Sequence, residues 1–224
     1  MYAIRSRPRR LALLSPFVAL WLATVAAPSA GAAHAYTRDL FFSGAYERQV
    51  DSRTCTAAST AIMVNLLAHR DLNLNQLTIL RYEQPRDALI DAVQRGSDPL
   101  GWSRAVTYFS AYTSRPTIYR WEAHATKSAA LRRAAVQLAA TGKPVGFLVQ
   151  HGRHAVVMTG VSTSADPTKR PFSVTGVAIS DPYGYSHRWY TASTAPLNTY
   201  LETDATATYD AAWYGKYVII VPLA

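Results

Sequence analysis

The chain has 224 residues, of which 49% are hydrophobic and 17% are charged, a composition typical of a globular protein with a sizeable core. Its formal net charge is +9, but the basic residues are scattered along the chain and form no basic helix face interleaved with aromatic side chains. Nucleic acid is therefore excluded as an expected partner, because proteins that bind it gather positive charge on one face.

The first 35 residues have the pattern of a signal peptide. Four arginines precede an almost wholly apolar stretch, residues 11–27, and small residues with A-x-A-like cleavage sites follow it. We expect cleavage between Gly31 and Tyr36, which leaves one domain of residues 36–224 that is secreted or held in the cell envelope. Without those arginines, 19 basic residues face 14 acidic ones, so the net charge falls to about +5.

An uncleaved membrane anchor is the alternative interpretation of the same segment. Its apolar stretch is close to the roughly 20 residues that span a bilayer. Pro16, Pro28 and the small residues that follow favour cleavage. After cleavage, we expect no stable membrane insertion.

The first half of the expected domain has helical patterns. Residues 55–70 carry an apolar stripe at helical spacing, and Ser52 or Thr54 precedes them as a candidate N-cap. A second, short helix is expected over residues 75–82. The sequence thus predicts that the first half of the domain is helical.

Two further helices are expected before the first long strand. Pro85 stands where a first helical residue would, and it predicts a helix over residues 86–95 that ends at Gly96. Ser97 or Asp98 then opens the next helix. The aromatic side chains of this region are expected in the core, with the wall of a substrate cleft as the alternative: Trp102, Tyr108, Phe109 and Tyr112.

The second half has the pattern of a sheet. A strand over residues 117–123 precedes a helix over residues 127–140, for which Thr126 is the expected N-cap and Gly142 the end. The other expected strands cover residues 145–150, 154–161, 172–180, 187–191 and 213–221. Residues 162–171 are expected to connect a hairpin. Helices followed by strands predict the α+β class.

Cys55, the only cysteine, opens the first expected helix. It cannot form an internal disulfide, although we expect the chain to be exported. The thiolate is the nucleophilic form of cysteine, and the positive end of a helix favours that negative charge. Cys55 is therefore the candidate nucleophile, and a small buried core residue is the alternative.

Two histidines compete for the role of general base. His154 starts an apolar strand directly after a glycine turn, so its side chain is expected at an end of the sheet, where it can face a helix N-terminus. His151 lies three residues earlier, within the turn itself. We favour His154 because it leads the strand, although a histidine at a strand edge is often only a surface residue.

Asp181 and Gln49 complete the candidate set. Asp181 ends the β-rich run before Pro182, so its carboxylate can orient an imidazole on the neighbouring strand, and it can equally be a turn residue. Gln49 precedes Cys55 by six residues, and its amide could donate to an oxyanion together with the backbone N–H of Cys55. The alternative for Gln49 is an exposed polar residue before a helix.

The order of these motifs resembles that of the papain-like cysteine peptidases that process bacteriocin leader peptides, the double-glycine peptidase type. The resemblance extends over about residues 46–184, and the motifs that carry it are Gln49 with Cys55, Gly142-Lys-Pro-Val145, Gly152-Arg-His154-Ala-Val-Val and Asp181-Pro-Tyr-Gly184. It implies a papain-like α+β fold, in which a central helix carries the thiol and an antiparallel sheet carries the histidine and the aspartate.

The resemblance also implies an activity. It indicates a thiol hydrolase that cleaves peptide (amide) bonds of a peptide or protein substrate without a metal or an organic cofactor, using Cys55, His154, Asp181 and Gln49. Two alternatives stay open: a non-catalytic cell-envelope or peptide-binding module with the same fold, and an acyltransferase with the same machinery. The sequence leaves the substrate, the cleavage preference and the oligomeric state open.

Overall fold

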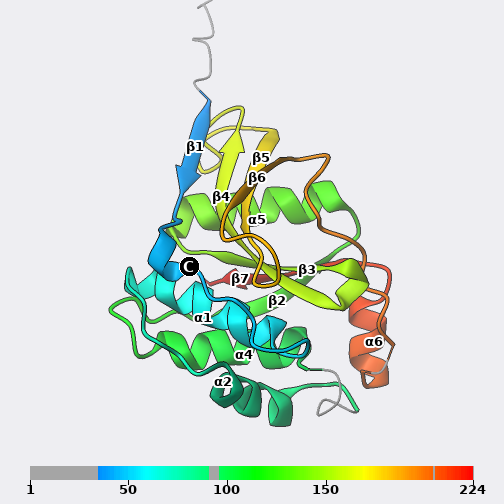
Figure 1. Ribbon diagram of the computed structural model, residues 1–224. Coiled ribbons are helices and arrows are strands. Elements are labelled where there is room, and N and C mark those ends of the chain that lie inside the picture. The colour runs from blue at the N-terminus through cyan, green and yellow to red at the C-terminus, as the bar shows by residue number, and fades with distance from the viewer. Residues whose placement is uncertain (1–34, 91–95, 204, 224) are drawn as a thin grey trace, which may run out of the picture. The chain divides into compact units, whose positions relative to one another are not determined.

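The computed structural model describes residues 35–90, 96–203 and 205–223 (Figure 1). The expected signal peptide lies outside these residues, except for Ala35. Across the described ranges, no helix has both the length and the apolar character needed to cross a bilayer.

An antiparallel sheet of seven strands lies at the centre of the described residues, with six of them in the order β2-β7-β3-β4-β5-β6 and β1 paired with β4 outside this order. The long strand β4 pairs with β3 through its first half and with β1 through its second half. The strands are β1 (Tyr36–Asp39), β2 (Tyr119–His124), β3 (Val145–Val149), β4 (His154–Thr163), β5 (Val174–Ser180), β6 (Arg188–Thr191) and β7 (Tyr217–Pro222).

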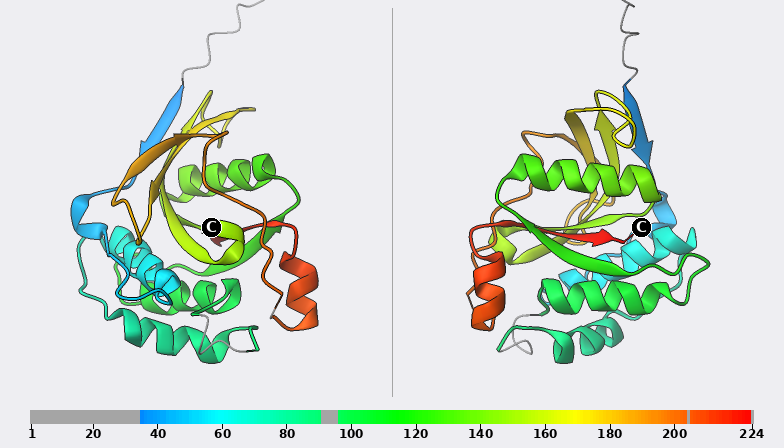
Figure 2. Two further views of the ribbon diagram at one scale, coloured as in Figure 1. Left: turned by 45° about the vertical axis from the view of Figure 1, so that its right-hand side comes forward. Right: turned by 180° about the vertical axis from the view of Figure 1, so that it is seen from behind.

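Helices cover both faces of this sheet (Figures 1 and 2). Helix α5 packs on one face, whereas α1 and α4 pack on the other, and α2 lies outside them. The helices are α1 (Cys55–Ala68), α2 (Gln76–Glu83), α4 (Pro99–Ser110), α5 (Lys127–Thr141) and α6 (Ala207–Trp213). The described residues therefore have the expected α+β architecture.

Strand β3 is buried on both faces because helices cover it from both sides. Successive side chains of a strand point to opposite faces, so Phe147 joins the cluster under α5, whereas Leu148 joins the cluster under α1 and α4. Gly146 is on the same face as Leu148, and the fully buried ring of Trp102 lies against its backbone. The close approach of α4 to the sheet requires a residue without a side chain at position 146.

Helix α1 is buried on every side, not only along its apolar stripe, since each residue from Thr56 to Leu67 is inaccessible or nearly so. Its polar side chains therefore bond within the protein. Ser59 Oγ donates to the carbonyl of Ala155 in β4, while Thr60 Oγ1 donates to Glu83 Oε1 in α2. The helix is thus joined to the sheet on one side and to α2 on the other.

Several expectations of local structure are confirmed. Thr126 caps α5 through a bond from Ala129 N, and Gly142 ends this helix with a positive φ of 63°. Asp98 caps α4 through bonds from the backbone nitrogens of its first turn. The loop between β4 and β5 connects an antiparallel hairpin, as expected, and the expected strands agree with those found to within a few residues except at β7.

The helix expected over residues 86–95 is wrong where it can be tested. A 3-10 turn covers Gln84–Arg86, and the chain is not helical from Asp87 to Ile90, while residues 91–95 lie outside the described ranges. The physical reason is a competing acceptor. Asp98 Oδ2 accepts hydrogen bonds from the backbone nitrogens of Ala88 and Leu89, which a continuing helix would bond internally.

The chain ends differ from expectation as well. Trp213 was expected to start the last strand, but it is the last residue of α6, and β7 begins at Tyr217. Trp213 is fully buried against Tyr200 and Trp121, and these aromatic contacts hold its side chain in the core at the end of α6. Strand β1 and helix α6 are two further elements that the sequence patterns did not indicate.

We predict that Gly146→Ala lowers the free energy of unfolding by about 1–3 kcal/mol, the usual cost of overpacking a core. An added Cβ would lie 2.4 Å from Trp102 Cη2 and 3.1 Å from Ile220 Cβ, so α4 would have to move. Urea titration measures the change. Gly184→Ala is the matched control, because the nearest atom to its Cβ would lie 3.9 Å away. Equal stability of both variants would contradict the packing argument.

Candidate active site

Cys55 is the first residue of α1, and it is partly exposed to solvent. One helical turn later, Ser59 Oγ donates to Ala155 O at 3.1 Å, and both groups are buried. Residues four positions apart lie on the same face of a helix, so Cys55 is on the face of α1 that contacts the beginning of β4. His154 is the residue directly before Ala155.

His154 is the first residue of β4 and is 6% exposed. Its Nε2 lies 2.7 Å from Oδ1 of Asp181, which directly follows β5. The two strands are antiparallel neighbours, with Val157 opposite Ser180. The start of one strand and the end of the other therefore meet at the same edge of the sheet, and this brings together two residues 27 positions apart.

Asp181 is held by a tight turn. Its Oδ1 also accepts from Tyr183 N at 2.9 Å, and its own N–H donates to Tyr185 O. Burial alone would raise the pKa of Asp181, but the hydrogen bonds from His154 and Tyr183 outweigh this and hold the pKa below its ordinary value. The carboxylate is thus ionised at neutral pH and oriented toward the imidazole.

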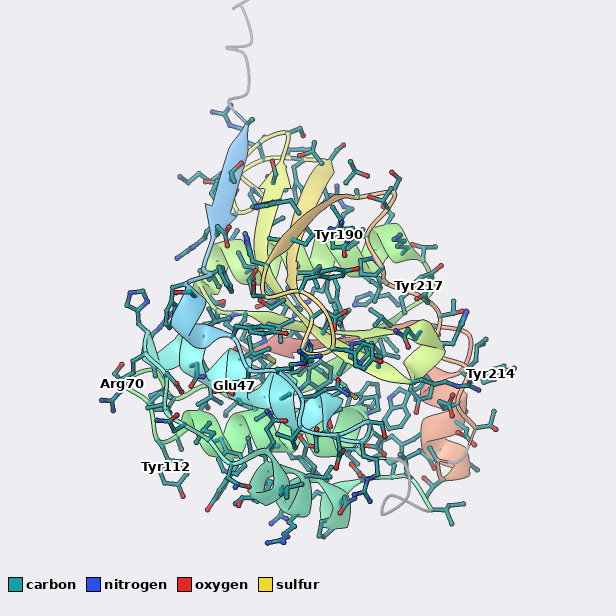
Figure 3. The ribbon with its side chains drawn as sticks, viewed as in Figure 1. Glu47, Arg70, Tyr112, Tyr190, Tyr214 and Tyr217 are labelled. Carbon is teal, nitrogen blue, oxygen red and sulfur yellow. The ribbon has the colours of Figure 1, made fainter. Side chains whose placement is uncertain are left out.

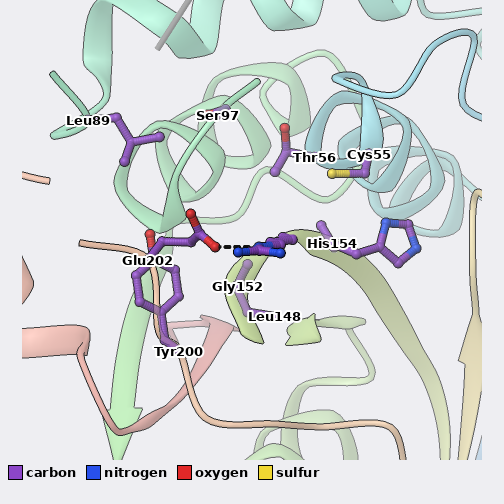
Figure 4. Close-up of a pocket in the computed structure, with 11 residues that line it drawn as sticks. Cys55, Thr56, Leu89, Ser97, Leu148, Gly152, His154, Tyr200 and Glu202 are labelled. Carbon is purple, nitrogen blue, oxygen red and sulfur yellow. Dashed lines mark hydrogen bonds and ion pairs between the residues drawn. The ribbon is translucent and has the colours of Figure 1, made fainter. Parts of the chain in front are cut away.

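The imidazole of His154 interacts with both Asp181 and Cys55. Burial alone would lower the pKa of His154, but the hydrogen bond to Asp181 and the hydrogen bond and charge interaction with Cys55 raise it to about 9. Because Nε2 is bound to Asp181, Nδ1 is the ring nitrogen left for the thiol. Both residues line the same pocket (Figure 4). The structure thus brings three of the four candidate residues together.

Gln49 is in the loop before α1, close to the turn that carries Asp181. Its backbone N–H donates to Pro182 O at 2.9 Å. Its side-chain Nε2 donates to Asp51 O at 2.8 Å, and its Oε1 is buried without a described hydrogen-bond partner. The amide nitrogen carries two hydrogens, and Asp51 takes one of them. The role of Gln49 as an oxyanion donor therefore stays a prediction.

The N-terminus of α1 is not capped by a side chain. Thr54 occupies the N-cap position as expected, but its Oγ1 bonds to the backbone of Asp51, and it does not bond to the first turn of the helix. The expected capping role of Ser52 or Thr54 is therefore wrong. Backbone N–H groups of a first helical turn have no partner within the helix, so they are available to a negative charge at Cys55.

A cavity of about 330 Å³ opens beside Cys55 and His154 (Figure 4). Its wall combines hydroxyl groups from Thr56 and Ser97 with apolar side chains and a rim ion pair, in which Arg153 Nε lies 2.8 Å from Glu202 Oε1. The remaining lining residues are Leu89, Leu148, Gly152, Ala155 and Tyr200. The nucleophile candidate therefore faces a space that can receive a substrate side chain.

His151, the rival base, is held away from Asp181. Its Nδ1 bonds to Thr199 O at 3.1 Å, and the residue is exposed with a φ of 60°. It is not among the residues that line the cavity beside Cys55. The preference for His154 over His151 agrees with this geometry.

The aromatic residues near α4 do not line this cavity. Trp102 is buried in the core, as expected, whereas Tyr108 and Tyr112 are 42% and 65% exposed. Tyr108 stacks on Tyr82 from α2, and Tyr112 projects outward on the helical side of the molecule (Figure 3). The core prediction thus holds for Trp102, but it is wrong for these two tyrosines.

Sequence patterns missed most of the cavity wall. Thr56 and Ser97 line it, and Tyr200 and Glu202 reach it from a segment with no regular element. Behind Thr56 lies Glu83, which is fully buried. The one available signal was Asp98 before Pro99, a helix-capping pattern that marked the start of α4 without indicating a cavity.

No protein-family model matches the chain, and a search of curated proteins found no match. Within the described residues, no group of three or more His, Cys, Asp or Glu side chains is placed to hold a metal ion.

We predict that Asp181→Asn lowers the pKa of His154 from about 9 toward its ordinary value of 6.5. The variant removes one of the two partners that raise the pKa, while the interaction with Cys55 and the burial that lowers the pKa remain. An NMR titration of the imidazole signals measures this shift, and a His151→Gln protein helps to assign them. A wild-type His154 that titrates near 6.5, or one that Asp181→Asn does not shift, would contradict the described interaction.

Proposed function

We propose that this protein is an exported thiol hydrolase that cleaves peptide (amide) bonds with Cys55 as nucleophile, His154 as general acid and base, and Asp181 as the group that orients His154. The observation that carries the proposal is the imidazole that bonds to Asp181 through one nitrogen and interacts with the only thiol of the chain on its other side. A catalytic site of this kind needs a nucleophile next to a base, and a third group that orients the base.

The first step forms a thioester. The thiol proton moves to His154 Nδ1, Sγ attacks the carbonyl carbon of the substrate, and the carbonyl π electrons move to oxygen to give a tetrahedral oxyanion. When this intermediate collapses, the C–N bond breaks, and His154 returns the proton to the leaving amine. Asp181 stays ionised throughout and stabilises the imidazolium.

The second step restores the enzyme. Water gives a proton to His154 and attacks the thioester carbonyl. The C–S bond then breaks, and the carboxylic acid leaves as Cys55 recovers its thiol proton. His154 serves both steps because Asp181 holds its ring in one orientation.

In both steps the oxyanion needs hydrogen-bond donors. The backbone N–H of Cys55 at the uncapped start of α1 is the first donor in our proposal, and the second hydrogen of Gln49 Nε2 is the other. Gln49 needs only a side-chain adjustment to serve, because its backbone is already bonded to the turn after Asp181.

A papain-like fold belongs to the same proposal. What supports it is the buried helix that begins with the thiol and packs against an antiparallel sheet whose edge holds the histidine and the aspartate. The signal-peptide pattern of the first 35 residues supports export. A peptide is the proposed substrate because cleavage of an amide bond needs a nucleophile that attacks the carbonyl carbon and an acid that protonates the leaving amine. Cys55 and His154 would supply these two groups.

We predict that iodoacetamide alkylates Cys55 at pH 6 at least about tenfold faster than it alkylates N-acetylcysteine, a free thiol that is almost wholly protonated at this pH. His154→Gln should reduce the rate to that of the free thiol, because the thiolate loses its imidazolium partner. Mass spectrometry follows the reaction, and the single cysteine makes its site unambiguous. His151→Gln is the matched control and should keep the wild-type rate. If wild type and His154→Gln react equally slowly, the proposed catalytic pair is wrong.

We predict that Gln49→Ala lowers kcat/KM by about 10²–10³-fold, the usual effect of losing one oxyanion donor. A mixed peptide library, with Cys55→Ser as the inactive reference, first identifies a cleaved sequence. Initial rates on that peptide then compare the two proteins. Gln49→Glu keeps the size of the side chain but supplies no N–H, so it should lose as much as Gln49→Ala. Wild-type activity in both variants would exclude Gln49 from catalysis.

A further inference from the structure

The cavity beside Cys55 is backed by buried carboxyl groups. Thr56 Oγ1 donates to Glu83 Oε2 at 2.7 Å, and Ser97 Oγ donates to Asp87 Oδ1, also at 2.7 Å. Thr56 and Ser97 both line the cavity. Each hydroxyl uses its single hydrogen toward a carboxyl group, so its oxygen keeps lone pairs that can accept a further hydrogen bond.

A third carboxylate, Asp98, adjoins Asp87. Its Oδ1 accepts from the nitrogens of Leu100 and Gly101, and its own N–H donates to Asp87 Oδ1 at 3.2 Å. In the part of the chain that the structure describes, no basic side chain lies within ion-pair distance of Glu83, Asp87 or Asp98. Among the described residues, the three acids thus lie together without a basic partner, and Asp87 Oδ2 is buried with no described hydrogen-bond partner.

Burial is the main cause of the raised pKa values in this part of the protein. Burial and the charge of Asp98 raise the pKa of Asp87, and burial raises the pKa of Glu83 to about 8. Tyr200 lines the cavity, and burial together with the charges of Asp98 and Glu202 raises its pKa. Asp87 and Asp98 lie so close that both can be ionised only at a cost in free energy, which a proton or a nearby cation compensates.

Positive charge at the cavity is confined to its edges. Arg153 is on the rim with a side chain that is 76% exposed, and its charge is balanced by Glu202. The imidazolium of His154 is bonded to Asp181. Neither group therefore opposes a cation next to Thr56 and Ser97.

We propose that this cavity is the specificity pocket of the enzyme and binds a positively charged Lys or Arg side chain of the peptide substrate beside the scissile bond. The methylene groups would pack on Leu89, Leu148 and Tyr200, and the charged end would bond to the hydroxyl oxygens of Thr56 and Ser97 in the field of the acids behind them. As the cation enters, Asp87 releases its proton to solvent, so the total charge of the pocket does not change.

This inference rests on the proposed function, and its test uses Cys55 itself as the reporter. Three iodoacetamides carry the same butyl chain on the amide nitrogen, which ends in an ammonium group, a methyl group or a carboxylate. The rate of alkylation of Cys55 at pH 7 is measured for each probe by mass spectrometry. Each rate is divided by the rate of the same probe with N-acetylcysteine, which removes differences in intrinsic reactivity.

We predict that wild-type protein prefers the ammonium probe to the methyl probe by at least about tenfold, as expected for one charge-assisted contact, and that the carboxylate probe reacts most slowly. Asp87→Asn should reduce the preference to within about twofold, because an amide cannot exchange a proton for a cation. The readout is the ratio of the ammonium rate to the methyl rate, because a general loss of thiol reactivity in this variant would lower both rates and leave their ratio unchanged.

Asp166→Asn is the matched control. It makes the same Asp-to-Asn change in the loop between β4 and β5, where Asp166 pairs with Lys169, and the preference should be unchanged. If Cys55 reacts rapidly and depends on His154 but does not discriminate among the probes, the specificity inference is wrong and the proposed function stands. If Asp166→Asn removes the preference as fully as Asp87→Asn, net charge is the cause and the pocket assignment is wrong. If no probe reacts faster than with the free thiol, both proposals fail.

Discussion

The burial of α1 on all sides is the constraint on which the rest of the structure depends. A helix without a solvent face must satisfy its hydroxyl groups inside the protein. Ser59 bonds to β4 at Ala155, whereas Thr56 and Thr60 bond to Glu83 in α2. Because these bonds hold two different sides of the helix, they fix its rotation about its own axis. The direction of Cys55 at the first position follows from that rotation.

Residues on two sides of α1 determine the charges around the thiol. On one side, Asp181 keeps the imidazole of His154 in its charged form, with a pKa of about 9. On the other side, Glu83 would place a negative charge against the first turn of α1, but burial raises its pKa to about 8. At neutral pH this acid is therefore largely neutral and still accepts the hydroxyl hydrogens of Thr56 and Thr60. The environment of Cys55 is thus positive on the His154 side without an opposing full charge on the Glu83 side.

Local sequence rules predicted the elements of the fold better than the site that they form. Asp98 and Thr126 cap helices where their patterns indicated, and the strand ends placed His154 near Asp181. The non-helical course from Asp87 to Ile90 was not predictable, since it depends on Asp98 about ten residues away. The cavity was hidden for the same reason, because its wall combines α1, β4 and two irregular segments that only the tertiary fold brings together.

Asp98 has both a structural role and an electrostatic effect near the cavity. The carboxylate that begins α4 also binds Ala88 and Leu89 and so fixes the wall that Leu89 contributes. Asp87 lies behind the lining residue Ser97, and burial together with the charge of Asp98 raises its pKa. A buried acid beside another acid costs free energy of folding unless a cation or a proton compensates it. Helix capping explains Asp98 without reference to a ligand, but it does not explain Asp87, whose second oxygen has no described hydrogen-bond partner. A proton compensates Asp87 at neutral pH, and a substrate cation in the adjoining cavity is the group that would replace this proton in our assignment of the pocket.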